Sequence, residues 1–251
     1  MARALVTGAS TGLGRATAEA LAVSGHEVVA HARAPGRFAD PAFGTRMHAL
    51  VFADLADPEQ TLHLGEELAA LGPMDVVIHN AGVFTGPDIL AVNVVAPYIL
   101  SAIMPVPARM IVLSSSMHRA GSTDLAGLDL TDATTRRRPY EDSKLCATTL
   151  AMALARLSPR CLVHAVDPGW VPTRMGGPTA SDDLAEGHRT QHWLATVEAG
   201  RITPRTGGYW YHHAVQDPHP AVRDERFQDE LLELLHAHTG RAPAGVDIPQ
   251  S

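Results

Sequence analysis

The sequence reads Ala4-Leu5-Val6-Thr7-Gly8-Ala9-Ser10-Thr11-Gly12-Leu13-Gly14 close to its start, and an amphipathic helical pattern follows at residues 12 to 24. A strand, a glycine-rich turn and a helix in this order are what a dinucleotide site requires. Gly8 would allow the tight turn, Gly12 would let a pyrophosphate approach the backbone, and Gly14 would let the helix pack closely. The free N–H groups at the start of the helix would then bind phosphate. A glycine cluster is weak evidence by itself, since ordinary strand-to-helix turns also contain glycine.

The rest of the chain alternates between short apolar runs and helical patterns. This alternation predicts an α/β fold, a single Rossmann-type domain over residues 1 to 251 with a doubly wound parallel sheet of about seven strands. We expect strands near residues 3 to 7, 26 to 31, 47 to 52, 74 to 79, 109 to 114, 161 to 166 and 207 to 211. We expect helices near residues 12 to 24, 58 to 71, 87 to 103, 137 to 157 and 222 to 238, with shorter pieces between 180 and 199. The Pro/Gly-rich segments at 35 to 44 and 168 to 178 are expected to be loops, and residues 240 to 251 a flexible tail.

Composition indicates a compact enzyme of the cytoplasm. The net charge of -7 argues against nucleic acid or an anionic membrane as partner, because both attract basic surfaces. Two cysteines, Cys146 and Cys161, are too few for a disulfide framework, and the 14 histidines show no metal-ligand spacing, so we expect no metal. No apolar stretch reaches the length of a membrane span, and a strand-like run begins by Arg3, which leaves no room for a signal peptide.

One lysine stands out, because all other cationic side chains among the 20 are arginines. Lys144 follows Tyr140 by four positions, so on a helix its compact ammonium would lie beside the phenol. A phenol has an ordinary pKa of about 10, and a neighbouring positive charge would make it a stronger acid at neutral pH. The alternative is that Lys144 is a surface lysine in an arginine-rich chain.

Further marks occur in a fixed order along the chain. They are Asp54-Leu55 after the third expected strand, Asn80-Ala81-Gly82 after the fourth, Asn93 in a helix, Ser115 after the fifth strand, and Pro168-Gly169-Trp170-Val171-Pro172-Thr173 after the sixth. Together with the glycine turn, Tyr140 and Lys144, this set resembles the short-chain dehydrogenase/reductase family over nearly the whole chain. The run Ser114-Ser115-Ser116-Met117-His118 and the long segment before Tyr140 are similar to its retinol-dehydrogenase-like branch.

The resemblance implies a role for four catalytic residues. Tyr140 would give a proton to, or take one from, the reacting oxygen, and Ser115 would hold that oxygen as an oxyanion-hole group. Lys144 would assist the phenolate and hold the nicotinamide ribose. Asn93 would fix a proton-relay water, although Asn80 and Asn93 lie closer together in this sequence than the family pattern leads us to expect. The choice of Ser115 among three consecutive serines rests on the Ser-Ser-x-x-His pattern.

The resemblance also implies a nicotinamide cofactor. Ala32 stands where an acidic residue would bind the ribose hydroxyls of NAD(H), and Arg33 follows it and could pair with a 2′-phosphate, with Ser10 as an additional donor. We therefore expect NADP(H) rather than NAD(H), with Arg33 as a plain surface arginine being the alternative. The expected cofactor-binding residues are Gly8, Ser10, Thr11, Gly12, Leu13, Gly14, Arg33, Asp54, Leu55, Asn80, Ala81, Gly82, Tyr140, Lys144, Pro168, Gly169, Val171 and Thr173.

The substrate would be chosen by a lid at about residues 170 to 205. Candidate lining residues for an apolar or aromatic carbonyl compound are Met117, His118, Trp170, Met175 and Trp193, although each could instead pack in the core. The run Arg136-Arg137-Arg138 is expected to be a solvated helix start without catalytic role. In the family the helix that carries Asn93 contributes to a dimer face, so the resemblance implies a homodimer or homotetramer, with the oligomeric state left open.

The function expected from these residues is hydride transfer between NADP(H) and a ketone, aldehyde or alcohol of small to medium size. An alternative keeps the fold and uses Tyr140 for dehydration, epimerisation or rearrangement in biosynthesis. A third hypothesis, a regulator that senses NADP without turnover, conflicts with the presence of the Tyr140/Lys144 pair.

Overall fold

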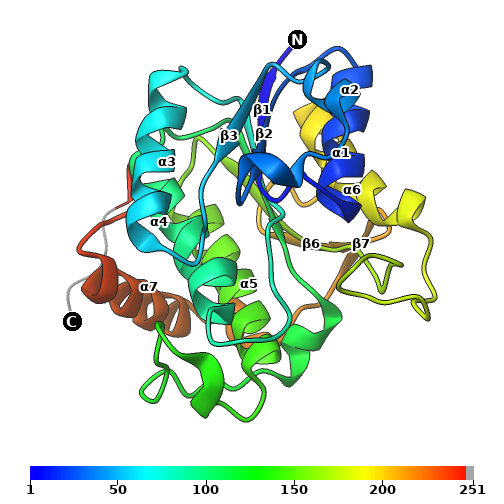
Figure 1. The fold of residues 1–251 in the computed structure, drawn as a ribbon. Coiled ribbons are helices and arrows are strands. Elements are labelled where there is room, and N and C mark those ends of the chain that lie inside the picture. The colour runs from blue at the N-terminus through cyan, green and yellow to red at the C-terminus, as the bar shows by residue number, and fades with distance from the viewer. Residues whose placement is uncertain (247–251) are drawn as a thin grey trace.

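The structure, a computed structural model, describes residues 1 to 246 and is built on one eight-stranded sheet in the order β3-β2-β1-β4-β5-β6-β7-β8 (Figure 1). The first seven strands are parallel, and β8 runs antiparallel to β7. The strands are β1 (Arg3–Val6), β2 (Glu27–Ala32), β3 (Ala49–Phe52), β4 (Val76–His79), β5 (Arg109–Leu113), β6 (Leu162–Asp167), β7 (Gly208–Tyr211) and β8 (Ala214–Gln216). The doubly wound α/β fold predicted from the sequence is confirmed.

Helices cover both faces of this sheet. The α-helices are α1 (Gly12–Val23), α2 (Pro41–Gly44), α3 (Pro58–Ala70), α4 (Ala96–Ile103), α5 (Pro139–Leu157), α6 (Leu184–Thr196) and α7 (Glu225–Thr239). A π-helical segment, η2 (Ala91–Val95), runs directly into α4, and the 3-10 segments are η1 (Pro35–Arg37), η3 (Ser116–Ala120), η4 (Ala133–Thr135), η5 (Ala199–Arg201) and η6 (Pro220–Arg223). Among the described helices none is long and apolar enough to span a bilayer.

Successive residues of each strand point to opposite faces, which divides the core into layers. In β1, Leu5 packs with buried residues of α3 and α4, whereas Ala4 and Val6 pack with residues of α1 and α6. A strand that is buried on both faces reads as a continuous apolar run rather than as alternating residues. This explains why the inner strands were predictable from short apolar runs.

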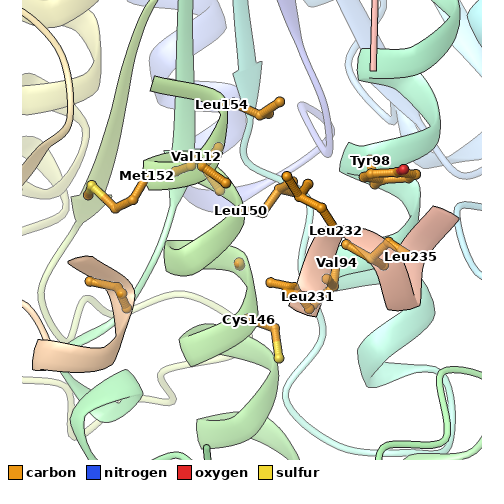
Figure 2. Close-up of a cluster of buried hydrophobic side chains, with 14 of the residues drawn as sticks. Val94, Tyr98, Val112, Cys146, Leu150, Met152, Leu154, Leu231, Leu232 and Leu235 are labelled. Carbon is orange, nitrogen blue, oxygen red and sulfur yellow. The ribbon is translucent and has the colours of Figure 1, made fainter. Parts of the chain in front are cut away.

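The C-terminal helix α7 closes the layer over α4 and α5. Figure 2 shows its side chains Leu231, Leu232 and Leu235 against Leu150 of α5 and Tyr98 of α4. The segment after α7 continues this cover: the Tyr98 hydroxyl donates to the Arg241 carbonyl at 2.6 Å, and the Ala244 N–H donates to the Ser101 carbonyl at 3.0 Å.

The structure corrects the sequence-based expectation in three places. β8 was not expected, because it is only three exposed residues long and its turn contains His212 and His213 at positive φ instead of glycine or asparagine. The helix expected from residue 87 begins at Ile89, and its next turn, η2, is π-helical. Residues 241 to 246 are packed rather than flexible, and the remainder of the expected tail, 247 to 251, lies outside the described residues.

Candidate active site

A cleft of about 660 Å³ opens at the carboxyl ends of the parallel strands, where ligands bind in open α/β sheets. One end, the glycine-turn end, is formed by Gly8 and residues 10 to 14 together with Arg33, Arg37 and Asp54. The other, the Tyr140 end, is formed by Phe84, Asp88, Tyr140, Arg174 and Met175. Of the residues expected to bind cofactor, those that line the cleft are Gly8, Ser10, Thr11, Gly12, Leu13, Gly14, Arg33, Asp54, Leu55, Asn80, Ala81, Gly82, Tyr140, Lys144, Pro168 and Thr173.

The glycine turn is shaped by close contacts that leave no room for side chains. Gly8 and Gly12 adopt positive φ of 66° and 57°, a region that other L-residues rarely adopt. A Cβ atom on Gly14 would collide with the Asn80 amide and with the Gly8 carbonyl oxygen. Thr11, the N-cap residue of α1, makes no side-chain cap bond, so the N–H groups of the first turn remain available to an anion.

Buried polar groups hold this turn in place from behind. The Thr7 hydroxyl accepts N–H bonds from Asn80 and Ala81, each at 3.0 Å, which ties the ends of β1 and β4 together. The Gly8 N–H donates to Nδ1 of His31 at 3.2 Å, and Nε2 of His31 donates to the Ala53 carbonyl at 3.0 Å. Burial lowers the pKa of His31 to about 4, so the ring stays neutral and Nδ1 remains an acceptor. The sequence analysis did not predict that His31 supports the glycine turn. The available signal was a histidine within an otherwise apolar strand.

Two arginines stand at the glycine-turn end, one more than expected. Arg33 follows β2 directly, is 63% exposed, and places Nε 4.0 Å from a carboxylate oxygen of Asp54. Arg37, on η1, also lines the cleft. The sequence pointed to Arg33 through its place after the strand, whereas Arg37 enters the cleft only because Pro35 begins a helical turn.

Tyr140 and Lys144 lie one turn apart near the start of α5, as their spacing predicted. Both side chains are buried, with Nζ of Lys144 5.7 Å from the centre of the Tyr140 ring. Nζ donates to the carbonyl of Leu113 at the end of β5, at 2.8 Å. Burial lowers the pKa of Lys144 to about 8, opposed by the negative charge of Asp167. Lys144 is therefore part of the interior and not a surface lysine.

The three serines after β5 have different surroundings. Burial raises the pKa of Tyr140 to about 12, with Asp167 and Glu141 adding to the rise, while the side chain of Ser115 lowers it. Ser114 is buried and pairs with the Thr148 hydroxyl at 2.6 Å. Ser116 is exposed. Ser115 is thus the serine beside the phenol.

Asn93 lies in the π-helical segment η2 and joins the β4 loop to α5. Its Oδ1 accepts from the Val83 N–H at 2.9 Å, and its Nδ2 donates to the Val83 carbonyl and to the Ser143 hydroxyl, each at 3.0 Å. Both Nδ2 protons are therefore used within the protein. The segment between Asn80 and Asn93 is short, but Asn93 still lies in the site. Gly82 is next to both Asn93 and Lys144: a Cβ atom built on Gly82 would lie 3.2 Å from Oδ1 of Asn93 and 3.6 Å from Nζ of Lys144.

The expected substrate residues separate into two groups. Met175 lines the cleft with its sulfur 3.9 Å from the Tyr140 hydroxyl, whereas Met117 and Trp170 are exposed and do not line it. His118 is instead buried, with Nδ1 donating to the Ser115 carbonyl at 2.6 Å and Nε2 accepting from the His219 N–H at 2.9 Å. Trp193 is partly buried and packs against Trp210 of the core, at 5.3 Å between ring centres.

Two further expected residues shape the cleft from outside its lining. Gly169 adopts a φ of 82°, and a Cβ there would collide with the carboxylate of Asp182, which accepts the Trp170 N–H at 2.7 Å. Val171 is buried and packs against Gly187 of α6.

Sequence reasoning missed Phe84, whose ring lies 4.6 Å from that of Tyr140. No periodic signal marked it, because it stands alone in a loop.

The expectation that Arg136 is solvated is wrong. Its side chain is only 12% exposed, and Nε donates to Oδ2 of Asp142 at 2.7 Å; the Asp142 side chain is 4% exposed. The other oxygen of Asp142 accepts the Ser122 N–H at 2.7 Å. A buried ion pair therefore joins the long segment after Ser115 to the first turn of α5, two residues from Tyr140.

Comparison with known proteins agrees with this geometry. Residues 2 to 103 match the family model described as short chain dehydrogenase. The short-chain dehydrogenase chyC of Penicillium rubens is 32% identical, over 96% of this chain and 98% of its own length. The chain belongs to the short-chain dehydrogenase/reductase family.

Other members of the short-chain dehydrogenase/reductase family extend the comparison. Retinol dehydrogenase 14 of Mus musculus is 30% identical, over 68% of this chain and 62% of its own, in line with the resemblance to that branch. The NADPH-bound carbonyl reductase from chicken fatty liver has the same fold, with a TM-score of 0.70 at 19% identity over 87% of this chain and 99% of its own. Within residues 1 to 246, no three His, Cys, Asp or Glu side chains are grouped to hold a metal ion.

Proposed function

We propose that this member of the family is an NADP(H)-dependent carbonyl reductase, or an alcohol dehydrogenase in the reverse direction. The observation that carries the proposal is that Tyr140 and Lys144 line one end of a cleft whose other end is the glycine turn, with Ser115 beside Tyr140. One α/β unit holds all of these residues, which supports a single domain over the described chain.

The residues present fit a dinucleotide. The glycine turn lines the cleft with the positive-φ conformation at Gly8 and Gly12 that lets a pyrophosphate approach the backbone, and the open N-terminal turn of α1 supplies N–H donors. Arg33 and Arg37 would pair with a 2′-phosphate, which favours NADP(H) over NAD(H). Several solved relatives of the same fold, such as the chicken carbonyl reductase, are NADPH complexes, which supports the choice. Bound at this site, the cofactor would supply or accept the hydride.

The chain's own residues would handle the oxygen and the proton. The hydroxyl of Ser115 would donate a hydrogen bond to the substrate oxygen and stabilise the negative charge that develops there. Tyr140 would transfer its proton to that oxygen. With a pKa of about 12 the phenol is protonated at neutral pH, which is the state needed for reduction. Transfer of this proton requires added positive charge nearby, and Lys144 is placed to provide it.

Asn93 would contribute through its backbone rather than its side chain. Because both Nδ2 protons bond to Val83 and Ser143, the side chain holds the β4 loop and α5 together. A π-helical turn disturbs the regular pattern of helical hydrogen bonds, so a backbone carbonyl in η2 is the better candidate to hold a relay water.

The test is consumption of NADPH in the presence of ketones, aldehydes and quinones, comparing the wild type with Tyr140→Phe. We expect the substitution to lower kcat by about 100-fold or more, the usual contribution of a positioned general acid. Tyr98→Phe is the matched control, since it removes a buried phenol hydroxyl far from the cleft, and it should leave kcat nearly unchanged. Unchanged turnover in Tyr140→Phe would contradict the mechanism, and tight NADPH binding without any turnover would favour a non-redox enzyme or a sensor.

A further inference from the structure

Exposed apolar side chains gather around the Tyr140 end of the cleft. Within residues 1 to 246, seven large hydrophobic side chains are exposed, and four of them belong to segments that meet Tyr140 or Ser115. We call these four the apolar rim; they are Phe84 (44% exposed), Met117 (38%), Trp170 (54%) and Met175 (44%). The other three are Met1, Val23 at the end of α1, and Val215 on β8.

Direct contacts link the rim to the reacting groups. The Phe84 ring lies 4.6 Å from the Tyr140 ring at an interplanar angle of 57°, and Met175 places its sulfur 3.9 Å from the Tyr140 hydroxyl. The Met117 N–H donates to the Ser115 hydroxyl oxygen at 3.2 Å. Trp170 donates its indole N–H to the Gly176 carbonyl at 2.9 Å, beside Met175. With that polar group satisfied inside its own segment, the ring faces remain for apolar contact.

Charge does not favour an ionic ligand at this end. Asp88, on the loop that carries Phe84, and Arg174, beside Met175, contribute one charge of each sign. Lys144 is buried and bonded to the Leu113 carbonyl. The arginine pair Arg33 and Arg37 belongs to the glycine-turn end. An exposed apolar surface next to reactive groups, without a net charge, is the surface expected where an apolar ligand is bound.

We propose that the substrate is a neutral carbonyl compound in which the carbonyl carries a flat apolar ring, and that Phe84 determines this specificity by stacking with that ring. The inference rests on the proposed function. In the reaction, hydride from NADPH adds to the carbonyl carbon, the phenol proton of Tyr140 passes to the oxygen, and solvent returns a proton to the tyrosine. Phe84 and Met175 line the cleft and both contact Tyr140, whereas Met117 and Trp170 are exposed on the segments that carry Ser115 and Met175.

The experiment measures kcat/KM with NADPH for three ketones: an aryl ketone such as acetophenone, a small aliphatic ketone such as butanone, and an anionic ketone such as phenylglyoxylate. We expect the neutral aryl ketone to be the best substrate of the three. Phe84→Ala should lower its kcat/KM by about 10-fold, mainly through KM, since the lost contact is apolar burial. The change for butanone should be less than about two-fold, and Phe84→Tyr, which retains the ring, should restore the aryl preference. Val215→Ala removes an exposed apolar side chain elsewhere and should change nothing.

Three outcomes decide between the two levels of the proposal. Turnover of all three ketones with equal kcat/KM would overturn the substrate class and leave the proposed function standing. A Phe84→Ala variant that loses activity on the aryl ketone and on butanone by the same factor would show that Phe84 only supports Tyr140, which also overturns the inference. No turnover of any carbonyl by wild type that binds NADPH would overturn the proposed function itself.

Discussion

At the glycine-turn end of the cleft the walls are backbone atoms held by buried polar groups, whereas at the Tyr140 end they are exposed side chains on connecting segments. The turn is fixed by Gly8, by Gly14 and by the bonds of Thr7 and His31, and each of these groups is packed against another strand. The side chains of Phe84 and Met175, by contrast, are each 44% exposed. A dinucleotide can be the same in many enzymes while substrates differ, so the rigid part would bind the common ligand and the loops would choose the variable one.

The largest effect should come from filling the rigid end. In Gly14→Ala the new methyl group would collide with the Asn80 amide and the Gly8 carbonyl, and neither can move without breaking the ties between β1 and β4. We expect NADPH binding to weaken by about 100-fold or more, which is about 3 kcal/mol. Gly200→Ala is the matched control, because a Cβ there has no neighbour within 4 Å. Titration of both variants with NADPH, with thermal unfolding measured alongside, checks this; equal binding would show that the turn adapts.

The same contrast explains what the sequence could reveal. Gly8 and Gly14 were predictable because a tight turn against a strand admits no other residue, and the pair Tyr140 and Lys144 because helical spacing alone brings the side chains together. Phe84 and Arg37 were not predictable, since a loop has no period that tells where a side chain points. Strand β8 was not predicted either, because its three exposed residues form no apolar run.

Three side chains, those of His118, Trp193 and Arg136, have surroundings that the sequence did not predict. Each contacts a residue that the sequence pattern did not identify as its partner. His118 and Trp193 were expected to line the substrate site, but His118 bonds to the loop at His219 and Trp193 packs on Trp210 of β7. Arg136 was expected in solvent because a run of arginines normally needs water. The carboxylate of Asp142 removes that need, and only the fold shows that the long segment turns back to meet α5.

The ion pair between Arg136 and Asp142 gives the second-largest effect and shows that the Tyr140 end is not loose throughout. Because both side chains are buried, Arg136→Met leaves the Asp142 carboxylate without its main partner. We expect the free energy of unfolding to fall by about 3 kcal/mol. Arg226→Met, which breaks the exposed pair with Glu230, should change it by less than about 0.5 kcal/mol. Urea unfolding of both variants measures this.

A double variant separates the pair from its surroundings. Arg136→Met with Asp142→Leu removes both charges, so most of the loss in stability should be recovered. Activity should fall in the single variant, mainly in kcat, because the pair holds the first turn of α5 and with it Tyr140. If the single variant is as stable as the wild type, the pair does not anchor the segment.

The lowered pKa of Lys144 should make the folding stability of the protein depend on pH. Its pKa falls from 10.5 to about 8 in the folded chain, so between these values the unfolded state binds more protons than the folded state. Folding stability therefore increases as pH rises through this window, and the cost of burying the ammonium, about 3 kcal/mol, is fully present below pH 8. Lys144→Met should lack this increase. Denaturant unfolding of both cofactor-free proteins from neutral pH upwards checks it, and parallel curves would contradict the shift.

The smallest effect should be at the outer edge of the glycine-turn end, where Arg33 is exposed and Arg37 is half-buried. Because exposed charges are screened, we expect Arg33→Ala and Arg37→Ala each to raise the KM for NADPH by about 10-fold and to leave that for NADH nearly unchanged. Arg46→Ala, at a surface arginine paired with Glu19, is the control and should affect neither cofactor. Salt should weaken NADPH binding in the wild type more than in the variants. Equal losses with both cofactors would show that the arginines support the fold of the cleft and do not read the 2′-phosphate.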